Sequence, residues 1–333
     1  MKKIFIGYTQ YQLLIFLLLK EKNDKITFIL PKYLERLKNN FNEKYEIKVF
    51  DLEKPSLKSI KRYIIYCLGL KKFIKTLNIT EDTILYGDNI INYLVSNKNL
   101  LYKIEDGTGN YNSKLYEEQL VSFKVKLYFI IENIIFLIIF RKRLLTEKEK
   151  LKKRVNKYYA TEIAPLNLWF ENITERINLK KLWDEKTEIE KEEILNIFGV
   201  TKKLLFEFDK KMILFTQPLS EDGIITEEKK IDLYKKILKN YDEEKIMIKP
   251  HPREKTKYAT IFKKCKVIEE NFPSEILKLM GIKIERAITM FSTAALHFDK
   301  DIKIDFYGTE IDKTIFETFG SQDEIMKRNA FLD

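Results

Sequence analysis

Short apolar segments alternate with helix-like segments in two separate series along this chain, and this alternation restricts its fold more than any other feature. The first series of strand-like segments is Lys3–Tyr8, Ile26–Leu30, Ile47–Phe50, Ile84–Tyr86 and Leu101–Ile104. The second is Met212–Phe215, Lys245–Ile248, Lys266–Ile268, Arg286–Thr289 and Ile302–Phe306. Strands that alternate with helices form parallel sheets, because each parallel connection needs a crossover. The sequence therefore predicts an α/β protein.

A length of 333 residues is more than one hydrophobic core usually accommodates, so we assign the two series to two domains. The predicted division is an α/β domain at 1–155, a second α/β domain at 156–312, and a helical tail at 313–333 that packs back on the first domain. Tyr158–Leu168 would open the second domain after a charge-rich connector. The predicted architecture is two doubly wound, Rossmann-like domains that face a cleft.

Two cysteines and two histidines limit the chemistry available to the chain. Cys67 and Cys265 lie far apart and show no metal-ligand spacing, which excludes a disulfide framework and argues against a zinc site. Asp299-Lys300-Asp301 is the one D-x-D motif, and we interpret it as a solvated turn. We therefore expect no metal and no cofactor, and a reducing cytoplasmic location.

The net charge of +11 arises from 61 Lys and Arg against 50 Asp and Glu. An AT-rich coding bias, which gives abundant lysine, explains this charge as well as an anionic substrate or an acidic membrane surface does. The chain has no zinc-finger, RNP-like or Gly-rich nucleic-acid motif, so nucleic acid is not an expected partner.

The longest apolar stretch, Leu127–Phe140, is interrupted by Glu132 and Asn133, and its length suits a buried helix better than a membrane span. Arg141-Lys142-Arg143 follows it directly. Three interpretations of this segment stay open: a core helix, a homodimer interface, or a peripheral contact with the inner face of the plasma membrane. The N-terminal apolar run is too short to indicate a secretory signal.

His251 is the residue most suggestive of catalysis, within Lys249-Pro250-His251-Pro252-Arg253 directly after a predicted strand. The unperturbed pKa of histidine lies nearest to physiological pH, the prolines restrict the backbone, and the two cations favour an anion. A Pro-rich turn explains the prolines but not the histidine between cations. The pattern suits a proton donor to an anionic leaving group such as a phosphate.

Three more unusual loops follow predicted strands, where ligands bind in parallel sheets. Two are acidic and Gly-containing, and each offers a carboxylate that can accept a proton from a hydroxyl. The third places hydroxyl side chains at a predicted helix N-terminus, which suits either phosphate binding or ordinary N-capping. The loops are Glu105-Asp106-Gly107-Thr108-Gly109, Gln217-Pro218-Leu219-Ser220-Glu221-Asp222-Gly223 and Phe291-Ser292-Thr293.

Taken together, these loops resemble the bacterial sialyltransferases of glycosyltransferase family 52. The family's acidic-acidic-Gly, His-Pro and later Ser-Ser/Thr motifs have counterparts at Glu221-Asp222-Gly223 or Glu105-Asp106-Gly107, at His251-Pro252 and at Ser292-Thr293. The resemblance spans most of the chain and is strongest from Thr216 to Ala295. It implies a GT-B fold, a CMP-sialic acid donor, inversion at the anomeric carbon, and no metal.

The resemblance also implies roles. His251 would be the general acid toward the departing phosphate. Asp222 is the first choice for the general base that deprotonates a galactose-type acceptor hydroxyl, with Asp106 as the alternative. The remaining predicted donor-side residues are Gln217, Pro218, Gly223, Lys249, Pro252, Arg253, Phe291, Ser292 and Thr293, and the acceptor-side residues are Glu105, Gly107 and Thr108.

Two other functions stay open at this point. One is transfer of a different nucleotide-activated sugar or polyol phosphate in surface-polymer synthesis. The other is a non-enzymatic, basic protein of the membrane surface. The sequence does not specify the acceptor glycan, which in the first interpretation is lipooligosaccharide or capsule.

Overall fold

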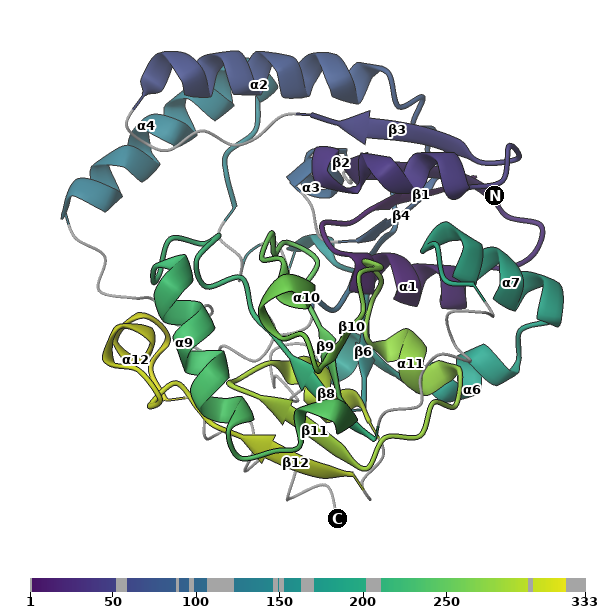
Figure 1. Cartoon of the computed structure of the whole chain (residues 1–333). Coiled ribbons are helices and arrows are strands. Elements are labelled where there is room, and N and C mark those ends of the chain that lie inside the picture. Colours follow the sequence, from purple (N-terminus) through teal and green to yellow (C-terminus); the bar gives the residue numbers. More distant parts are fainter. Residues whose placement is uncertain are drawn as a thin grey trace. The chain divides into compact units, whose positions relative to one another are not determined.

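Two parallel sheets, each covered by helices, make up the part of the protein that the structure describes (Figure 1). The computed structural model describes residues 2–51, 59–87, 90–95, 99–106, 123–145, 149, 153–162, 171–201, 211–298 and 302–321. The chain divides into two compact units, Met1–Ile194 and Leu195–Asp333. All strand pairs among the described residues are parallel, as the alternation of strands and helices predicts.

The first sheet has seven strands in the order β3-β2-β1-β4-β5-β6-β7. This order reverses direction between β1 and β4, which is the doubly wound pattern. The strands are β1 (Lys2–Ile6), β2 (Lys25–Pro31), β3 (Glu46–Phe50), β4 (Ile84–Gly87), β5 (Leu101–Ile104), β6 (Lys157–Thr161) and β7 (Thr174–Ile177).

Helices cover both faces of this sheet. The helices of the first unit are α1 (Gln10–Leu19), α2 (Ile60–Lys75), α3 (Ile90–Val95), α4 (Phe123–Phe140), α6 (Leu179–Asp184) and the 3-10 helices η1 (Lys32–Asn40) and η4 (Glu171–Ile173), and α7 (Glu188–Ile197) crosses into the second unit. Buried residues of α2, α3 and α4 share one core with β1, β2, β4 and β5. On the other face the ring of Phe16 in α1 stacks on Phe5 of β1, with centroids 4.9 Å apart.

Helix α1 is apolar nearly all round because it is enclosed. Residues Gln12–Leu18 are all buried, and α1 contacts both strand β5 of the sheet and helix α6. Thr9 caps its N-terminus by accepting the backbone N–H of Gln12 at 3.2 Å. A helix placed between two layers cannot present a polar face, which explains its composition.

The second sheet has five strands in the order β10-β9-β8-β11-β12. They are β8 (Met212–Phe215), β9 (Ile246–Lys249), β10 (Lys266–Val267), β11 (Arg286–Thr289) and β12 (Lys303–Phe306). The helices are α9 (Glu227–Leu238), α10 (Tyr258–Ile261), α11 (Glu275–Leu279), α12 (Lys313–Phe319), η5 (Glu243–Lys245) and η6 (Thr293–His297). The apolar stripe of α9 buries Leu233, Tyr234 and Ile237 against β8, β9 and β11.

The division of the chain differs from the predicted boundary after residue 155. β6 pairs with β5 and β7 pairs with β6, so both strands extend the first sheet. The unit boundary falls after Ile194. The charge-rich segment before β6 is typical of a connector, and only the strand pairing reveals that the chain returns to the same sheet.

The described part of the C-terminal tail belongs to the second unit, not to the first as predicted. Ile315 of α12 is fully buried in the core that contains α9. Phe319 lies against Phe291, with ring centroids 5.1 Å apart. Residues 322–333 of the predicted helical tail lie outside the described residues.

Gly87 allows β4 to approach β1 closely, and the substitution Gly87→Ala tests this. Its φ is 117°, and a Cβ there would meet the carbonyl oxygen of Ile6 at 1.9 Å. The clash adds to the cost of positive φ, so we expect Gly87→Ala to lower the free energy of unfolding by more than about 2 kcal/mol. Gly281→Ala is the control, because Gly281 also has positive φ but no atom within 4 Å of the added Cβ. Equal losses in urea unfolding would contradict the steric argument.

Candidate active site

Three of the predicted loops leave the second sheet at the carboxyl ends of adjacent strands. Phe215 at the end of β8 pairs with Lys249 of β9 on one side and with Thr289 of β11 on the other. The backbone N–H of Thr216 donates to the Lys249 carbonyl at 3.3 Å. The loops that carry Gln217–Gly223, His251 and Ser292 therefore begin side by side at the carboxyl end of the sheet.

His251 is held in one tautomer by its own turn. The backbone N–H of Arg253 donates to Nδ1 of His251 at 3.2 Å, so Nδ1 acts as an acceptor. In a neutral imidazole the proton then resides on Nε2. The backbone N–H of His251 donates to Oε2 of Glu254 at 2.7 Å, which fixes the turn itself.

The imidazole of His251 is neutral at pH 7 in this arrangement. Burial lowers its pKa to about 4, and the positive charges of Arg253 and Lys249 act in the same direction against Glu221. An anion placed beside the ring would raise the pKa again, because it favours the imidazolium. The site is thus able to take up a proton as negative charge arrives or develops next to it.

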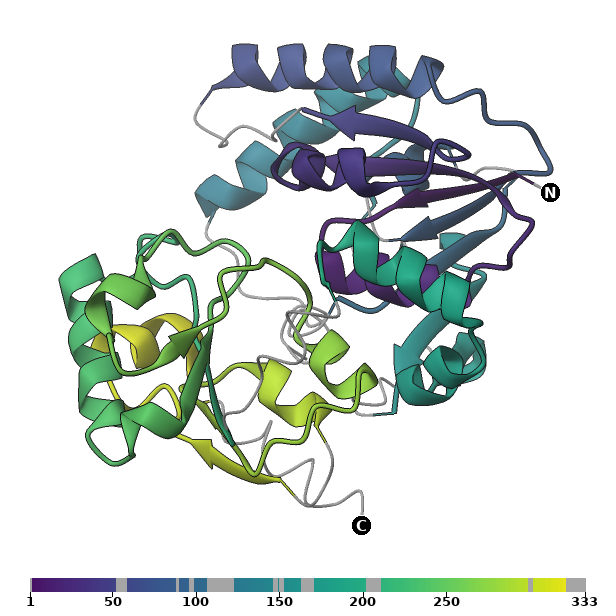
Figure 2. The same ribbon diagram turned by 45° about the vertical axis from the view of Figure 1, so that its right-hand side comes forward.

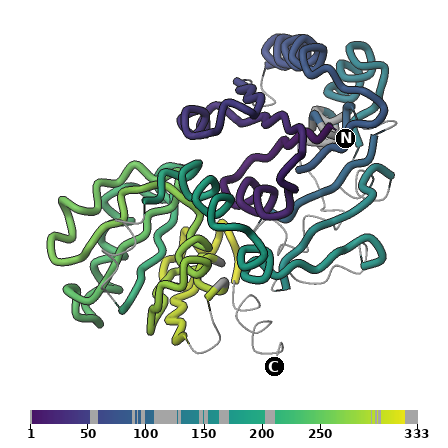
Figure 3. Tube along the Cα trace, turned by 90° about the vertical axis from the view of Figure 1, so that its right-hand side faces the viewer, coloured from purple at the N-terminus to yellow at the C-terminus, as the bar shows by residue number. Residues whose placement is uncertain are grey.

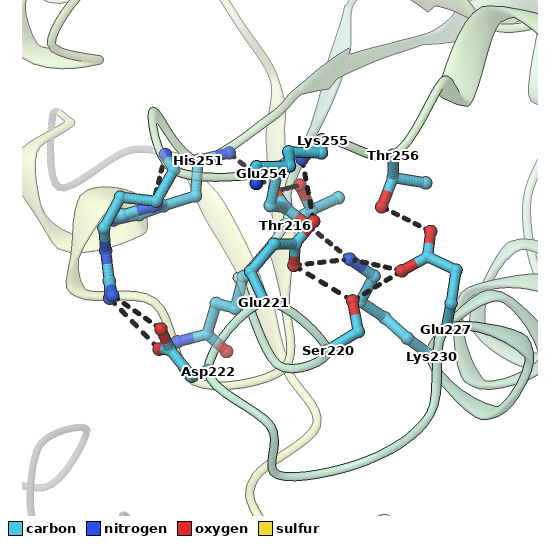
Figure 4. Close-up of polar contacts among 12 residues, drawn as sticks. Thr216, Ser220, Glu221, Asp222, Glu227, Lys230, His251, Glu254, Lys255 and Thr256 are labelled. Atoms are coloured by element: carbon cyan, nitrogen blue, oxygen red, sulfur yellow. Dashed lines mark hydrogen bonds and ion pairs between the residues drawn. The ribbon is translucent and has the colours of Figure 1, made fainter. Parts of the chain in front are cut away.

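Asp222 and His251 are connected through Arg253. Nη1 and Nη2 of Arg253 donate to the two carboxylate oxygens of Asp222 at 2.5 and 3.1 Å. This bidentate pair orients the carboxylate, while the backbone of the same arginine orients the imidazole. Figure 4 shows Asp222 and His251 in the two neighbouring loops.

Gln217 offers an acceptor that no side chain or backbone group satisfies among the described residues. Its Oε1 is buried without a hydrogen-bond partner, whereas its backbone N–H donates to the hydroxyl of Tyr234 at 2.8 Å. Such an atom is costly unless a ligand hydroxyl or amine donates to it. The turn closes beyond Pro218, whose carbonyl accepts the N–H of Asp222 at 2.8 Å, and Gly223 supplies a φ of 71°.

The remaining predicted donor-side residues take structural positions at the same edge. Oγ of Ser292 accepts the backbone N–H of Ala294 at 3.3 Å, which is the capping geometry, and Thr293 is the first residue of η6. Phe291 is buried. The carbonyl of Pro252 accepts the side chain of Asn271 at 2.8 Å. The Lys249 ammonium is buried over Phe272 and donates to the Glu270 carbonyl at 3.1 Å.

A buried ionic cluster beneath the loops was missed in the sequence. Nζ of Lys230 lies 2.8 Å from Glu221, 3.1 Å from Glu227 and 3.5 Å from Glu254, and its side chain is fully buried (Figure 4). Its signal in the sequence is a lysine on the apolar stripe of α9, three and four residues before Leu233 and Tyr234. A lysine at such a position is expected to have buried carboxylate partners.

The cluster joins the β8 loop to the β9 loop. Glu221 accepts the backbone N–H of Lys255 at 2.7 Å, and Glu227 accepts the hydroxyl of Thr256 at 2.6 Å. Glu254 also accepts the hydroxyls of Tyr258, at 2.6 Å, and of Thr216. Asp222 directly follows one member of the cluster, and His251 lies one turn before another.

The acidic loop of the first unit has a different character. The Glu105 carboxylate is fully buried and accepts the Tyr11 hydroxyl at 2.5 Å and the backbone N–H and hydroxyl of Thr161 at 2.6 and 2.8 Å. Burial raises its pKa, against those hydrogen bonds. Glu105 therefore connects α1 to β6 instead of facing an open surface. Asp106 is half-buried and accepts the Thr9 hydroxyl at 2.8 Å. Gly107 and Thr108 lie outside the described residues.

Comparison with known proteins assigns the chain to a family. The sequence profile of glycosyltransferase family 52 matches residues 12–315, most of the chain. An uncharacterized protein of Haemophilus influenzae is 38% identical over 328 residues, which cover 96% of this chain and 99% of that protein. The chain belongs to glycosyltransferase family 52.

Two solved structures resemble this glycosyltransferase in fold. The α/β-galactoside α-2,3-sialyltransferase of Photobacterium phosphoreum is 16% identical, with a TM-score of 0.58, and the match covers 98% of this chain and 96% of that one. The GT-B domain of a sialyltransferase from Photobacterium damselae is 12% identical, with a TM-score of 0.59 and the same coverage. The architecture is GT-B-like, as predicted.

The described residues of this family 52 glycosyltransferase contain no group of three or more His, Cys, Asp or Glu side chains placed to hold a metal ion. Asp299-Lys300-Asp301 lies outside them. None of the helices that the structure describes has the length and apolar character needed to cross a membrane. The groups at this site that face an incoming anion are the hydrogen-bond donor of His251 and the backbone of the three loops.

The ionisation of Glu221 stabilises the folded glycosyltransferase, and Glu221→Gln tests this. Burial alone would raise the Glu221 pKa, but hydrogen bonds from Lys230 and from the backbone N–H of Lys255 lower it from 4.5 to about 2. A lowered folded-state pKa contributes stability that is complete above pH 4.5 and is lost as pH falls toward 2. We expect Glu221→Gln to cost roughly 3 kcal/mol at pH 7.

The cost should shrink between pH 4.5 and 2, measured by urea unfolding at several pH values. Glu228→Gln, on the exposed side of α9, is the matched control and should cost little at any pH. A cost of Glu221→Gln that stays constant with pH would show that shape, not charge, is responsible.

Proposed function

We propose that this protein is an inverting, metal-independent sialyltransferase. It would move sialic acid from CMP-sialic acid to a terminal galactose-type hydroxyl of a bacterial surface glycan, lipooligosaccharide or capsule. Family membership supports glycosyl transfer, and the motif pattern around Asp222, His251 and Ser292 supports the sialyl donor. The observation that carries the proposal is the neutral His251 with its proton on Nε2 at the sheet edge shared by all three second-unit loops.

The chemistry of the leaving group explains why the three loops could stabilise it without a metal. CMP departs as a phosphate monoester, and one protonated imidazole with helix-terminal and backbone donors can offset the charge that develops. His251 donates a hydrogen bond through Nε2 to the phosphate. Its pKa rises beside that anion, so the imidazole can be protonated when the glycosidic bond breaks. Ser292 caps η6 and Thr293 begins it, and the Ser292 hydroxyl and the Thr293 backbone N–H would donate hydrogen bonds to the same phosphate.

Asp222 is the proposed base. Its carboxylate would accept the proton of the attacking hydroxyl, which approaches the anomeric carbon from the face opposite to CMP, so the configuration inverts. The ion pair with Arg253 holds the carboxylate in place and must open or turn for the acceptor to reach it. Asp106 remains the alternative base from the first unit, with Thr9 as its orienting partner.

The side chain of Gln217 suits the nucleotide donor because its Oε1 lacks a hydrogen-bond partner. A phosphate has no proton to give to the unpartnered Oε1 of Gln217, whereas the hydroxyls of the ribose and the amine of the cytosine do. We therefore assign Gln217 to the nucleoside part of CMP. We place the reaction in the cytoplasm, because neither Cys67 nor Cys265 forms a disulfide and both are buried.

Three substitutions decide which carboxylate is the base. We expect Asp222→Asn to lower kcat by about 10²- to 10⁴-fold and Asp106→Asn to have a smaller effect, because general-base catalysis accounts for factors of this size. Arg253→Gln is the control, since it removes the same ion pair but leaves the Asp222 carboxylate. Release of CMP from CMP-sialic acid with a galactose-terminated acceptor, with and without EDTA, is the measurement. Near-normal turnover in Asp222→Asn with an inactive Asp106→Asn would reverse the assignment.

CMP should stabilise the folded protein. A ligand present at about a hundredfold above its Kd adds about 2.7 kcal/mol to the free energy of unfolding, which raises the melting midpoint by several degrees. We expect this shift with CMP, a smaller one with UMP, and a reduced CMP shift in Gln217→Ala. Thr260→Ala, at an exposed position of α10, is the control variant. A midpoint unchanged by millimolar CMP argues against a sialyl donor and for another activated sugar.

A further inference from the structure

The carboxylate of Glu254 fixes the turn on which His251 lies. Its Oε2 accepts the backbone N–H of His251 at 2.7 Å, and the backbone N–H of Glu254 donates in return to the His251 carbonyl at 2.9 Å. The backbone N–H of Arg253 donates to Nδ1 of the same imidazole. Both backbone groups and one ring nitrogen of His251 are therefore held by contacts within residues 251–254.

The Glu254 carboxylate is itself held by three other segments of the second unit, which is drawn green to yellow in Figures 2 and 3. Oε2 also accepts the hydroxyl of Thr216, directly after β8, and Oε1 accepts the hydroxyl of Tyr258 on α10 at 2.6 Å. The ammonium of Lys230 on α9 lies 3.5 Å from Oε1. The side chain of Glu254 is fully buried, so these protein groups define its position.

Each oxygen of Glu254 faces a group that can only donate. The backbone N–H of His251 lies at Oε2, and the ammonium of Lys230 lies near Oε1. A hydroxyl can turn and accept, but an amide N–H and an ammonium cannot. A carboxylate suits both sides, whereas the amide of a glutamine has one oxygen and must place its NH2 group against one of the two donors. The contacts therefore favour Glu over Gln, although the two side chains have the same shape.

We propose that Glu254 is a positioning residue for His251, which holds the turn in the conformation that presents Nε2 of the imidazole at the carboxyl end of the sheet. Glu254 acts through the backbone of His251 and not on the substrate. This inference rests on the proposed role of His251 as the general acid. A misplacement of about 1 Å costs about 10²-fold in rate, so loss of the contact affects kcat more than donor binding.

Histidine NMR tests the inference without substrate, because the chain contains only two histidines. Labelled imidazoles give signals for His251 and His297, and His251→Asn assigns them. The His251 ring of the parent should stay in the Nε2–H tautomer and neutral down to about pH 5, since burial lowers its pKa to about 4. In Glu254→Gln the released turn exposes the ring, so its pKa should rise toward 6.5 and the tautomers should mix.

Tyr258→Phe is the matched control, because it removes a hydrogen bond from the same carboxylate at the other oxygen, Oε1. We expect it to lower the melting midpoint and to leave the His251 signals close to those of the parent. Thr216→Val removes the second donor to Oε2 and should shift the His251 signals as Glu254→Gln does, by a smaller amount. Melting midpoints verify that each variant is folded, and Thr216→Val keeps the test available if Glu254→Gln is not.

Turnover of the nucleotide sugar that the parent accepts gives the second readout. We expect Glu254→Gln to lower kcat by roughly 10- to 100-fold and to change the KM for the donor by less than about threefold. In a His251→Ala background the same substitution should lower kcat by less than about twofold. Two residues that act through one imidazole are not additive, whereas a general loss of structure would lower both backgrounds alike.

Three outcomes would overturn the inference. The first is an unchanged tautomer and pKa of His251 in folded Glu254→Gln. The second is a fall in kcat of equal size in the parent and His251→Ala backgrounds, and the third is an equal change of the His251 signals in Tyr258→Phe. The NMR readout needs no donor, so it distinguishes failure of this inference from failure of the sialyl-transfer proposal.

Discussion

One buried ammonium group organises the candidate active site. Lys230 has no contact with solvent, and a buried charge is tolerated only when opposite charges surround it. Three carboxylates do so, and they come from the β8 loop, the start of α9 and the β9 loop. Removing the ammonium would leave these carboxylates together without compensation. The positions of Asp222 and His251 therefore depend on a residue that has no direct part in the proposed chemistry.

Within the cluster, burial shifts each pKa in one direction and the neighbouring charges and hydrogen bonds shift it in the other. Burial would lower the pKa of Lys230, yet Glu221, Glu254 and Glu227 raise it, so the lysine stays charged. Burial raises the pKa of Glu254, against its hydrogen bonds from Thr216, Tyr258 and the His251 backbone. The same low dielectric keeps His251 neutral until an anion arrives. The charged cluster around Lys230 thus supports the loop of His251, whose imidazole can become protonated when an anionic substrate binds.

The two units use parallel strands in different ways. In the second unit the strand ends open into loops with an unsatisfied acceptor on Gln217 and a donor on His251, as suits a ligand site. In the first unit the carboxylate of Glu105, directly after β5, accepts hydrogen bonds from Tyr11 and Thr161. Asp106 beside it is half-buried. The outer helices of the first unit, in contrast, leave apolar side chains exposed.

The sequence by itself determined the strand-helix alternation, the parallel sheets, and the loops that carry Asp222, His251 and Ser292, because these depend on local periodicity and on the rule that ligands gather at strand ends. Only the tertiary structure decided which sheet receives β6 and β7, since a strand's partner lies far away in the chain. The same holds for Lys230. Its helix pattern shows that it faces inward, but its three carboxylates come together only when the strands are placed side by side. Whether Leu127–Phe140 is covered was likewise a question of packing, because a helix that is apolar on all sides can be enclosed like α1 or half-exposed like α4.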